Sequence, residues 1–194
     1  VDVSVATITT PPTTAPDWDA MEHVSLSAND PPRVHLLGHG ELSTLVTVTG
    51  CGALTWKGLD VNRFREDAVF DAGGIYVYVR DLTTNTLWSA GFQPTHTQPD
   101  AYEAAFTIDR VALQRKDGEI ETVMEIVASP EHPAEVRRIT VTNHGTQPVD
   151  LDLTGYTELV LARRSADIAH RTFSSMFIET EAVPSHNALL AKRR

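Results

Sequence analysis

Cysteine is almost absent from this sequence, since Cys51 is the only one among 194 residues. A single cysteine excludes an intrachain disulfide and cannot supply the paired thiolates of a cysteine-rich zinc site. A cytosolic or otherwise reducing compartment is therefore compatible with the chain. No covalent staple is required, because a chain of this length can bury enough apolar surface for one large core.

Long apolar runs and an excess of positive charge are also missing. No run approaches the roughly 20 residues of a membrane span, and the N-terminus lacks the basic and apolar regions of a signal peptide. We therefore expect a soluble chain. Its formal net charge of −10 argues against a nucleic-acid partner, because phosphate binding relies on clustered lysine and arginine.

Signatures of nucleotide binding, metal binding and hydrolysis are absent as well. The sequence contains no GxGxxG, GxxxxGK[ST], HExxH or GxSxG motif. Its eight histidines are dispersed, and although His35 and His39 could meet across a turn, no carboxylate or cysteine stands at ligand spacing from them. We expect neither a metal nor a cofactor.

What the sequence has in quantity is period-two alternation of apolar and polar residues. In the segment 75–80, Ile75, Val77 and Val79 alternate with polar or aromatic residues, which predicts a strand with one face in a core. Similar segments lie at 42–49, 53–57, 59–64, 87–88, 102–107, 110–115, 119–127, 136–142, 149–161, 173–181 and 188–192. About a dozen strands without a useful helical period predict an all-β, large antiparallel β-sandwich.

Turn and breaker residues divide the chain. Prolines and threonines in the first 33 residues favour an extended arm or linker, although 17–27 could hold a short turn or strand, and the sandwich domain is expected over 34–194. Lys116-Asp117-Gly118 predicts a hairpin turn. The long segment 149–161 must bend, and we expect the bend at Gly155. Residues 166–170 form the only plausible helical turn.

Polar residues concentrate in the charged loop that follows the predicted strand 59–64. The loop carries Arg63, Arg65, Glu66, Asp67 and Asp71. Its carboxylates could supply a pair for general acid and base catalysis. The arginines at alternate positions would neutralise them, so a salt-bridged loop is favoured over a catalytic pair.

Aromatic residues also gather in this part of the sequence. Trp56, Tyr76, Tyr78, Trp88, Phe92 and Tyr102 could offer ring faces for stacking on sugars, whose C–H surfaces are apolar. The competing interpretation is an ordinary sandwich core with cross-strand aromatic pairs. Composition favours the core, because buried aromatics are the commoner use of such residues.

Four blocks of the sequence, taken in order, carry a family resemblance. They read GALTWKGLDVNRFRED, GGIYVYVRDLTTNTLWSAGFQPT, DAYEAAFTIDRVALQRKDGEIETVMEIVASPEHPAEVRRITVTNHG and GYTELVLARRSADIAHRTFSSMFIETE. From about residue 32 to residue 194, the chain resembles the N-terminal β-sandwich region of the disaccharide phosphorylases in family 94 of the glycoside hydrolases. It looks particularly similar to the corresponding region of cyclic β-1,2-glucan synthases.

The resemblance implies a supersandwich similar to galactose mutarotase domains, followed by helices and an (α/α)6 catalytic barrel. In the family the catalytic general-acid aspartate and the phosphate-binding residues belong to that barrel, so no residue here inherits those roles. The complete enzyme would catalyse reversible phosphorolysis of a β-glucosidic bond or build cyclic β-1,2-glucan from UDP-glucose, in the cytoplasm or at the inner membrane. The chain departs from the family pattern at 37–42, where relatives usually read Ser-Asn-Gly-Arg-Tyr, which puts a polar contact there in doubt.

These observations together predict a non-catalytic carbohydrate-binding or docking domain, with no catalytic activity in this chain alone. The expected partners are a glucose-containing oligosaccharide or glucan and the catalytic barrel, with a homodimer as a further possibility. The candidate carbohydrate-binding residues are Trp56, Arg63, Arg65, Glu66, Asp67, Tyr76 and Trp88. Two alternatives remain open: a purely structural or dimer-interface domain, and a mutarotase-like aldose epimerase that pairs His35 or His96 with Glu103 or Glu158.

Overall fold

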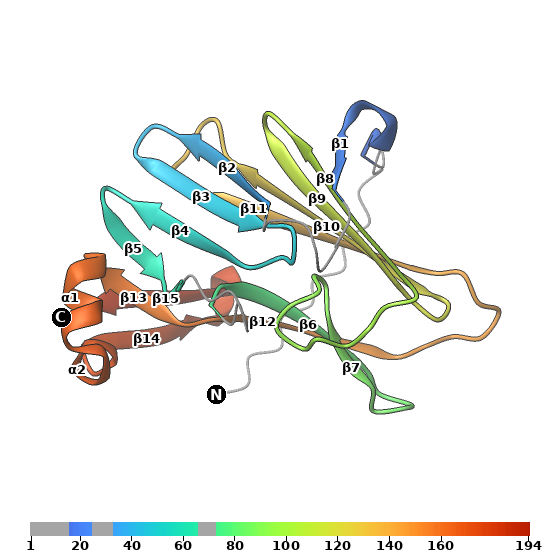
Figure 1. Ribbon diagram of the computed structural model, residues 1–194. Coiled ribbons are helices and arrows are strands. Elements are labelled where there is room, and N and C mark those ends of the chain that lie inside the picture. Colours follow the sequence, from blue (N-terminus) through green and yellow to red (C-terminus); the bar gives the residue numbers. More distant parts are fainter. Residues whose placement is uncertain (1–15, 25–32, 66–72) are drawn as a thin grey trace.

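The structure is a computed structural model that describes residues 16–24, 33–65 and 73–194 (Figure 1). Its regular structure is mostly antiparallel strands, which confirms the predicted all-β fold class. The strands are β1 Glu22–Val24, β2 Val34–His39, β3 Leu42–Thr47, β4 Gly52–Trp56, β5 Leu59–Asn62, β6 Ile75–Asp81, β7 Leu87–Ser89, β8 Ala101–Thr107, β9 Arg110–Asp117, β10 Ile120–Ala128, β11 Glu135–Asn143, β12 Leu151–Thr157, β13 Leu159–Ala162, β14 Ile178–Val183 and β15 Ala188–Arg193.

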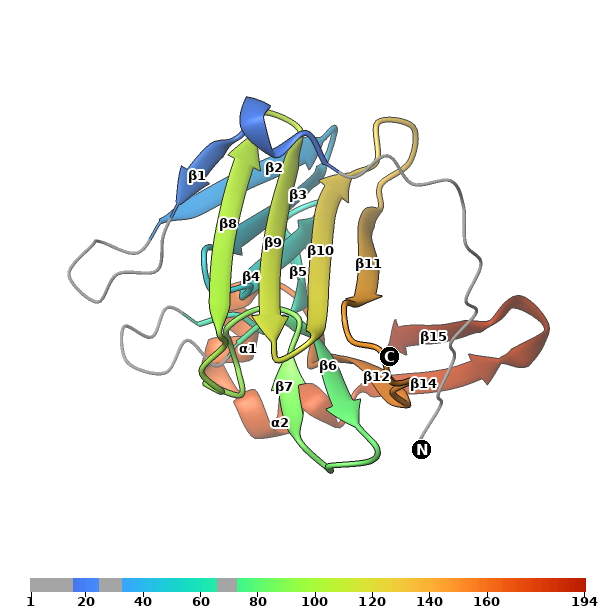
Figure 2. The ribbon, with the colours of Figure 1, turned by 90° about the vertical axis from the view of Figure 1, so that its right-hand side faces the viewer.

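The strands form three sheets and a separate hairpin. Sheet A has the order β1-β8-β9-β10-β11, sheet B has the order β13-β5-β4-β3-β2, and sheet C has the order β12-β6-β7. Strands β14 and β15 pair only with each other among the described residues, and we call them the C-terminal hairpin. In Figure 2, sheet A faces the viewer and the strands of sheet B lie behind it. Sheets A and B are therefore the two layers of the sandwich.

The main core lies between sheets A and B. Strands β8, β9 and β10 contribute every second side chain to it, as the alternation predicts, and β2 and β3 contribute from the other layer. Its fully or nearly fully buried members include Leu113, Met124 and Ile126 from sheet A and Val46 from sheet B. A second cluster joins sheet C to one end of sheet A, where Trp88 packs with its neighbours on β6 and β10.

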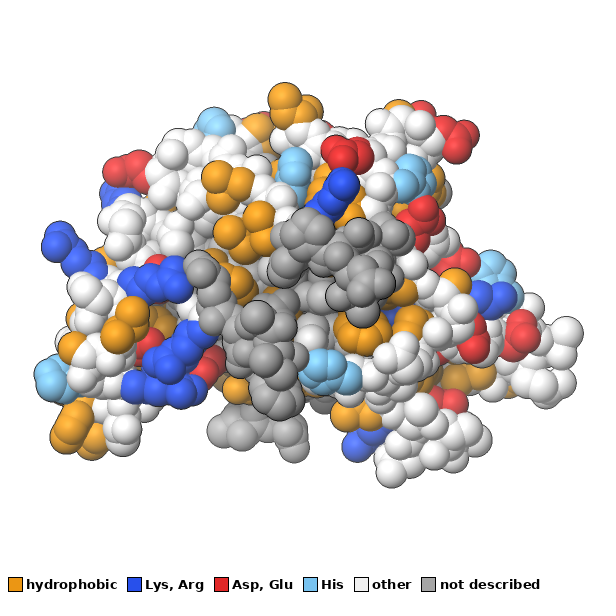
Figure 3. Space-filling view, in the orientation of Figure 1, with side chains coloured by type: hydrophobic (Ala, Val, Ile, Leu, Met, Phe, Trp, Pro, Cys, Tyr) orange, Lys and Arg blue, Asp and Glu red, His pale blue; other side chains and the backbone are white. Residues whose placement is uncertain are grey.

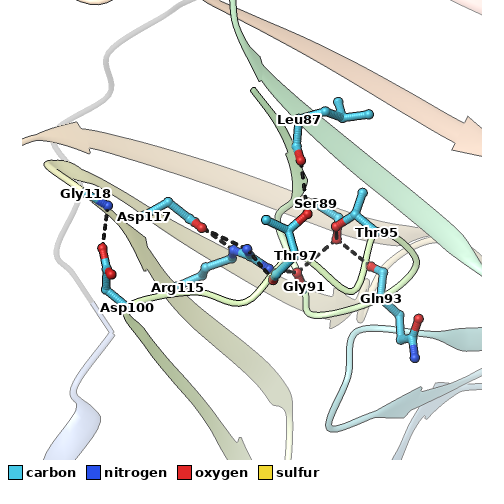
Figure 4. A network of polar contacts seen from close by, with 10 residues as sticks. All are labelled: Leu87, Ser89, Gly91, Gln93, Thr95, Thr97, Asp100, Arg115, Asp117 and Gly118. Carbon is cyan, nitrogen blue, oxygen red and sulfur yellow. Dashed lines mark hydrogen bonds and ion pairs between the residues drawn. The ribbon is translucent and has the colours of Figure 1, made fainter. Parts of the chain in front are cut away.

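The hairpin predicted at Lys116-Asp117-Gly118 is confirmed. Strands β9 and β10 pair from Asp117 with Ile120 onward, and Gly118 has a φ of 59°, a left-handed backbone that glycine adopts without strain. Next to this turn, Arg115 points into the molecule and is fully buried. Figure 4 shows its guanidinium between Asp117 and the loop that leads from β7 to β8.

Arg115 fastens that loop to sheet A. Its Nη1 donates to the Gly91 carbonyl at 3.0 Å and its Nη2 to the Thr97 carbonyl at 2.8 Å. Its Nε and Nη2 also donate to the two carboxylate oxygens of Asp117, at 2.7 and 2.8 Å. The buried charge is thus paired and four of its five N–H donors are used, as a buried guanidinium requires.

The N-terminal segment is in part attached to the sandwich. Trp18–Ala20 forms a 3-10 turn, and β1 pairs with β8 at the edge of sheet A. Met21 and Trp18 pack over Ala105 and Ala112 on the face of sheet A that points away from the core. A strand within 17–27, left open by the sequence, therefore forms. The domain boundary at residues 33 and 34 stays a prediction.

Two predicted strands are corrected near the C-terminus. The segment 149–161 is two strands that break at Glu158 and not at Gly155, and β13 is bulged against β5 around Leu161, whose φ is 49°. The predicted strand 173–181 starts late, because residues up to Ser175 belong to a helix. Two short helices fill the gap, α1 at Arg164–Ala169 and α2 at Arg171–Ser175.

No helix in the described part of the chain is long and apolar enough to cross a bilayer.

Candidate functional site

The predicted polar cluster around Arg63 exists, but its partners come from elsewhere in the chain. Arg63 follows β5 directly and is only 5% exposed. Its Nε and Nη2 donate to the two carboxylate oxygens of Asp167 at 2.9 and 2.6 Å, and its Nη1 donates to Glu158. Asp167 lies on α1 and Glu158 lies between β12 and β13, so one guanidinium joins three segments.

The charges in this cluster neutralise one another. The hydrogen bonds from Arg63 hold the pKa of the Asp167 carboxyl below its usual range, against the opposing effect of burial. The same bond to Asp167 raises the pKa of the Arg63 guanidinium. A carboxylate held ionised by a bidentate arginine is a poor proton donor at neutral pH. The cluster is therefore suited to positioning α1 and not to acid and base catalysis.

A small cavity opens beside this ion pair. It has a volume of about 280 Å³ and is lined by Asp60, Arg63, Phe64, Arg65, Arg164, Asp167 and Ile168. Burial raises the pKa of the Asp60 carboxyl, while Arg164 acts in the opposite direction. Arg65 and Arg164 are exposed, and neither forms a hydrogen bond or ion pair with another described residue.

Exposed apolar side chains also occur on the two helices and on the C-terminal hairpin, and one of them, Ile168, lines this cavity. We call this surface the docking corner; it comprises α1, α2, residues 176–177 and the C-terminal hairpin. Its exposed large apolar residues are Ile168, Phe173, Met176, Phe177, Leu189 and Leu190, between 46% and 73% exposed. Arg164 and Arg171 are exposed on the same helices, and the exposed Arg163 directly precedes α1. Figure 3 shows lysine and arginine side chains gathered on the side of the molecule where α1 lies.

The docking corner is held to the sandwich by Arg193. Its Nη1 donates to the carbonyls of Val160 and Ser174, each at 3.0 Å, and its guanidinium lies 5.5 Å from the centre of the Phe177 ring. A mainly apolar cavity of about 420 Å³ lies here, between α1, α2 and β15, and includes Phe173 and Phe177 in its lining. The hydrogen bonds of Arg193 thus attach the docking corner to the sandwich, while the apolar side chains of the corner remain exposed.

The five predicted carbohydrate-binding residues that the structure describes do not share one surface. Trp56 is 38% exposed at the β4–β5 turn, with the Lys57 ammonium 4.7 Å from its ring centre. Tyr76 and Trp88 are each 4% exposed, which fits the competing interpretation that these aromatics fill the core. Arg63 and Arg65 line the same cavity. The two acidic candidates, Glu66 and Asp67, lie outside the described residues.

The histidine and glutamate pairs considered for an epimerase are engaged with other residues. Glu103 is paired with His23 and Glu158 with Arg63. His35 stacks on Phe106 with ring centres 5.2 Å apart, and His96 lies edge-on to Phe92 at 6.1 Å. No contact between the described residues joins either histidine to either glutamate. Nor does the described part of the chain bring together three or more side chains that could hold a metal ion.

Sequence reasoning missed Glu158 and Asp167 as the partners of Arg63. They lie 95 and 104 residues further along the chain, so no local spacing links them to Arg63. The only local signal is that Asp167 is the one acid in a short segment that also contains Arg163, Arg164 and Arg171.

Comparison with known proteins gives consistent results. A family model described as "Glycosyl hydrolase 94, supersandwich domain" matches residues 22–194. The chain is 36% identical over 146 residues, 75% of its length, to the cyclic beta-(1,2)-glucan synthase NdvB of Rhizobium meliloti, and the match covers 5% of that protein.

Two phosphorylases are also similar. A 3-O-beta-D-glucopyranosyl-beta-D-glucuronide phosphorylase of Paenibacillus borealis is 31% identical over 40% of this chain and 10% of its own length. An N,N'-diacetylchitobiose phosphorylase of Vibrio furnissii is 24% identical over 85% of this chain and 21% of its own length. The chain therefore spans only 5% to 21% of the length of these relatives.

Proposed function

Because the chain belongs to the family of glycosyl hydrolase 94 supersandwich domains, we propose that it is a non-catalytic domain of a glucan-processing enzyme and docks against the catalytic barrel that the family resemblance implies. The observation that carries the proposal is the docking corner, where six large apolar side chains are between 46% and 73% exposed. Phe173 and Phe177 line one mainly apolar cavity, and exposed apolar surface of this kind marks an interaction site in soluble proteins.

The exposed arginines near the apolar residues indicate which charge a partner surface should carry. Arg163, Arg164 and Arg171 are exposed and have no ion pair with a described residue, although the chain as a whole carries a net charge of −10. A local basic rim on an acidic protein favours a partner surface with an apolar centre and aspartate or glutamate at its edge. A second copy of this chain would bring the same arginines together and is disfavoured.

The lengths of the relatives support a partner within the same polypeptide. The match covers at most 21% of the two phosphorylases and 5% of the glucan synthase, so most of each relative lies outside this domain. A domain tethered to its partner has a high effective concentration and needs only a modest interface. The docking corner, with its short helices and hairpin, suits such an interface.

Footprinting by hydroxyl radicals tests the proposal, in the 194-residue chain and in the complete enzyme. We expect Phe173 and Met176 to be modified in the isolated chain and protected in the complete enzyme. Ile108, which is 96% exposed on the β8–β9 turn, is the matched control and should be modified equally in both. Equal modification of Phe173 in both samples would contradict docking through this corner. Protection in the isolated chain that increases with its concentration would identify a homodimer instead.

A pair of variants of the complete enzyme provides the second test. Phe173→Ser combined with Met176→Ser should restore modification of the neighbouring Phe177 and lower the temperature at which the domain unfolds. Ile108→Ser should change neither. In the isolated chain both variants should fold with unchanged stability, because the substituted side chains are already exposed.

A second candidate function is glycan contact at the β4–β5 turn, and the exposure of Trp56 supports it. An exposed indole face can stack on a sugar ring. Millimolar glucose or sophorose should then shift the NMR signals of Trp56 and of the charged loop that starts at Arg63. Unchanged signals at that concentration would contradict it.

A further inference from the structure

The face of sheet A that points away from the core contains a polar cavity that the docking corner does not use. Its volume is about 470 Å³, and its lining residues are His23, Ala101, Tyr102, Glu103, Gln114, Lys116 and Glu121. This face is the one turned toward the viewer in Figure 2, and α1 and α2 lie behind and below sheet A in that view. The cavity therefore lies on a different face of the molecule from α1 and α2.

Strand register brings the lining side chains together. Glu103 pairs with Gln114, Ala101 pairs with Lys116, and Lys116 in turn pairs with Glu121 across three neighbouring strands. Residues in register on adjacent strands have side chains on the same face of the sheet. The small side chain of Ala101 leaves room between the longer ones, which creates the hollow.

The N-terminal segment forms one wall of the cavity. His23 on β1 reaches the carboxylate of Glu103 through its Nδ1, and its Nε2 donates to the Trp18 carbonyl at 2.7 Å. The Trp18 ring lies 6.2 Å from the His23 ring, centre to centre. Both ring nitrogens of His23 face acceptors, so the doubly protonated imidazolium satisfies both contacts.

The opposite wall is fixed by a network around Glu121. Gln114 Nε2 donates to Glu121 Oε1 at 2.9 Å, and His144 Nε2 donates to Glu121 Oε2 at 2.7 Å. The bond from His144 lowers the pKa of the Glu121 carboxyl, so the carboxylate stays charged at neutral pH. The amide of Gln114 is thereby held in one orientation, with its oxygen pointing away from Glu121.

Three polar groups in the cavity have no hydrogen-bond partner among the described residues. They are Glu103 Oε2 and Gln114 Oε1, which are acceptors, and the ammonium of Lys116, which is a donor. Acceptors and a donor within one hollow match the vicinal hydroxyl groups of a sugar, each of which donates and accepts. A free anion would meet the two carboxylates, and a free cation would meet Lys116 and His23.

From this geometry we propose that the outer cavity of sheet A binds a neutral, polyhydroxylated ligand, one or two hexose units of a glycan chain. Its volume falls within the range of about 300 to 1,000 Å³ typical of small-molecule sites. His23, Glu103, Gln114 and Glu121 are already held by hydrogen bonds, so binding a ligand costs little conformational entropy at these four side chains. The cavity holds the glycan and makes or breaks no bond in it.

NMR titration of the 194-residue chain tests the proposal with sophorose, a disaccharide of glucose, as the probe. We expect millimolar sophorose to shift the backbone signals of Ala101, Gln114 and Lys116. Glucuronate and glucosamine, which carry one charge each, should bind more weakly than glucose. Absence of shifts at these residues, or shifts confined to Trp56, would overturn the proposal.

Two variants locate the ligand. Gln114→Ala and Lys116→Ala should each weaken sophorose binding about five- to tenfold, the effect of one lost hydrogen bond. Arg80→Ala, which removes an exposed charge on sheet C, is the matched control and should leave binding unchanged. Unchanged binding in both cavity variants would also overturn the proposal. Failure here leaves the docking proposal intact, because footprinting of Phe173 and Met176 does not involve a sugar.

Discussion

The two layers of the sandwich, sheets A and B, form what we call the sandwich body. The sandwich body and the docking corner contain the same kinds of apolar residue, but these are buried in the body and exposed in the corner. In the body, Leu113 and Ile126 are fully buried, because sheet B covers the inner face of sheet A. In the docking corner, Phe173 and Leu189 are 62% and 63% exposed, because no second layer covers them among the described residues. The apolar side chains of the body are therefore covered within this chain, whereas those of the docking corner need a partner to cover them.

Buried arginines show the same contrast. Arg115 in the body is bound by two carbonyls and a carboxylate that all lie within the sandwich. Arg63, at the edge of the corner, is bound to Glu158 and Asp167, and the side chain of Glu158 is 44% exposed. We expect substitutions in the body to lower the free energy of unfolding strongly. Substitutions in the docking corner should have little effect on it in the isolated chain.

The largest effect is expected from removing the buried charge of the body. Arg115→Ala leaves Asp117 and the carbonyls of Gly91 and Thr97 without their donor and should lower the free energy of unfolding by about 3 to 5 kcal/mol. Arg80→Ala, in an exposed ion pair, should cost about 0 to 1 kcal/mol. Urea unfolding monitored by tryptophan fluorescence measures both. Equal losses of unfolding free energy in the two variants would contradict the expected difference between buried and exposed arginines.

Truncation of matched leucines compares the two regions directly. Leu113→Ala removes a fully buried side chain and should cost about 2 to 5 kcal/mol, because a cavity is left behind. Leu189→Ala removes a side chain that is 63% exposed and should change stability by less than about 0.5 kcal/mol in the isolated chain. A large cost for Leu189→Ala would mean that the corner is already packed in the isolated chain.

The Arg63 cluster should give an intermediate, pH-dependent effect. Asp167→Asn removes the carboxylate that receives two bonds from Arg63 and should cost about 1 to 3 kcal/mol at pH 7. Because the folded pKa of Asp167 lies below the ordinary aspartate value of 3.8, its contribution is present above that value and is lost as the pH falls through the folded pKa. Unfolding curves of both proteins should therefore converge in acid and stay apart at neutral pH.

The smallest effect is expected where β1 joins the body. The hydrogen bond to Glu103 raises the pKa of His23 above the ordinary histidine value of 6.5, so the contribution of this pair is complete below 6.5 and is lost as the pH rises through the folded pKa. NMR titration should place the midpoint of the His23 ring above 6.5, and Glu103→Gln should lower it. A midpoint that Glu103→Gln leaves unchanged would show that the pair does not form in solution.

Local patterns predicted the body better than the corner. Alternation identified the strands of sheet A and the glycines identified the turn at Gly118, because strand faces and left-handed turns are decided by neighbouring residues. The bend placed at Gly155 was wrong, since the break at Glu158 accompanies the long-range bond of that residue to Arg63. A contact between residues 95 positions apart cannot be predicted from the spacing of neighbouring residues.

The helical residues at 171–175 were missed for a related reason. Phe173 and Met176, read as part of a β-strand, carry apolar side chains that point to solvent, so their pattern does not report burial within this chain. The predicted loop residues Glu66 and Asp67 lie outside the described part of the chain, and their role stays a prediction. The aromatic residues Tyr76 and Trp88 follow the commoner use of large rings as core.

The C-terminal hairpin has a consequence for handling the isolated domain. Neither β14 nor β15 has a strand beside its outer edge in the described residues, and Figure 2 shows the hairpin projecting away from sheet A. A free strand edge is a template for pairing with another chain, and the charges of Glu179, Glu181, Lys192 and Arg194 oppose this here. Concentrated or salt-screened samples should therefore polymerise edge to edge, beginning at Ile178–Val183 and Ala188–Arg193.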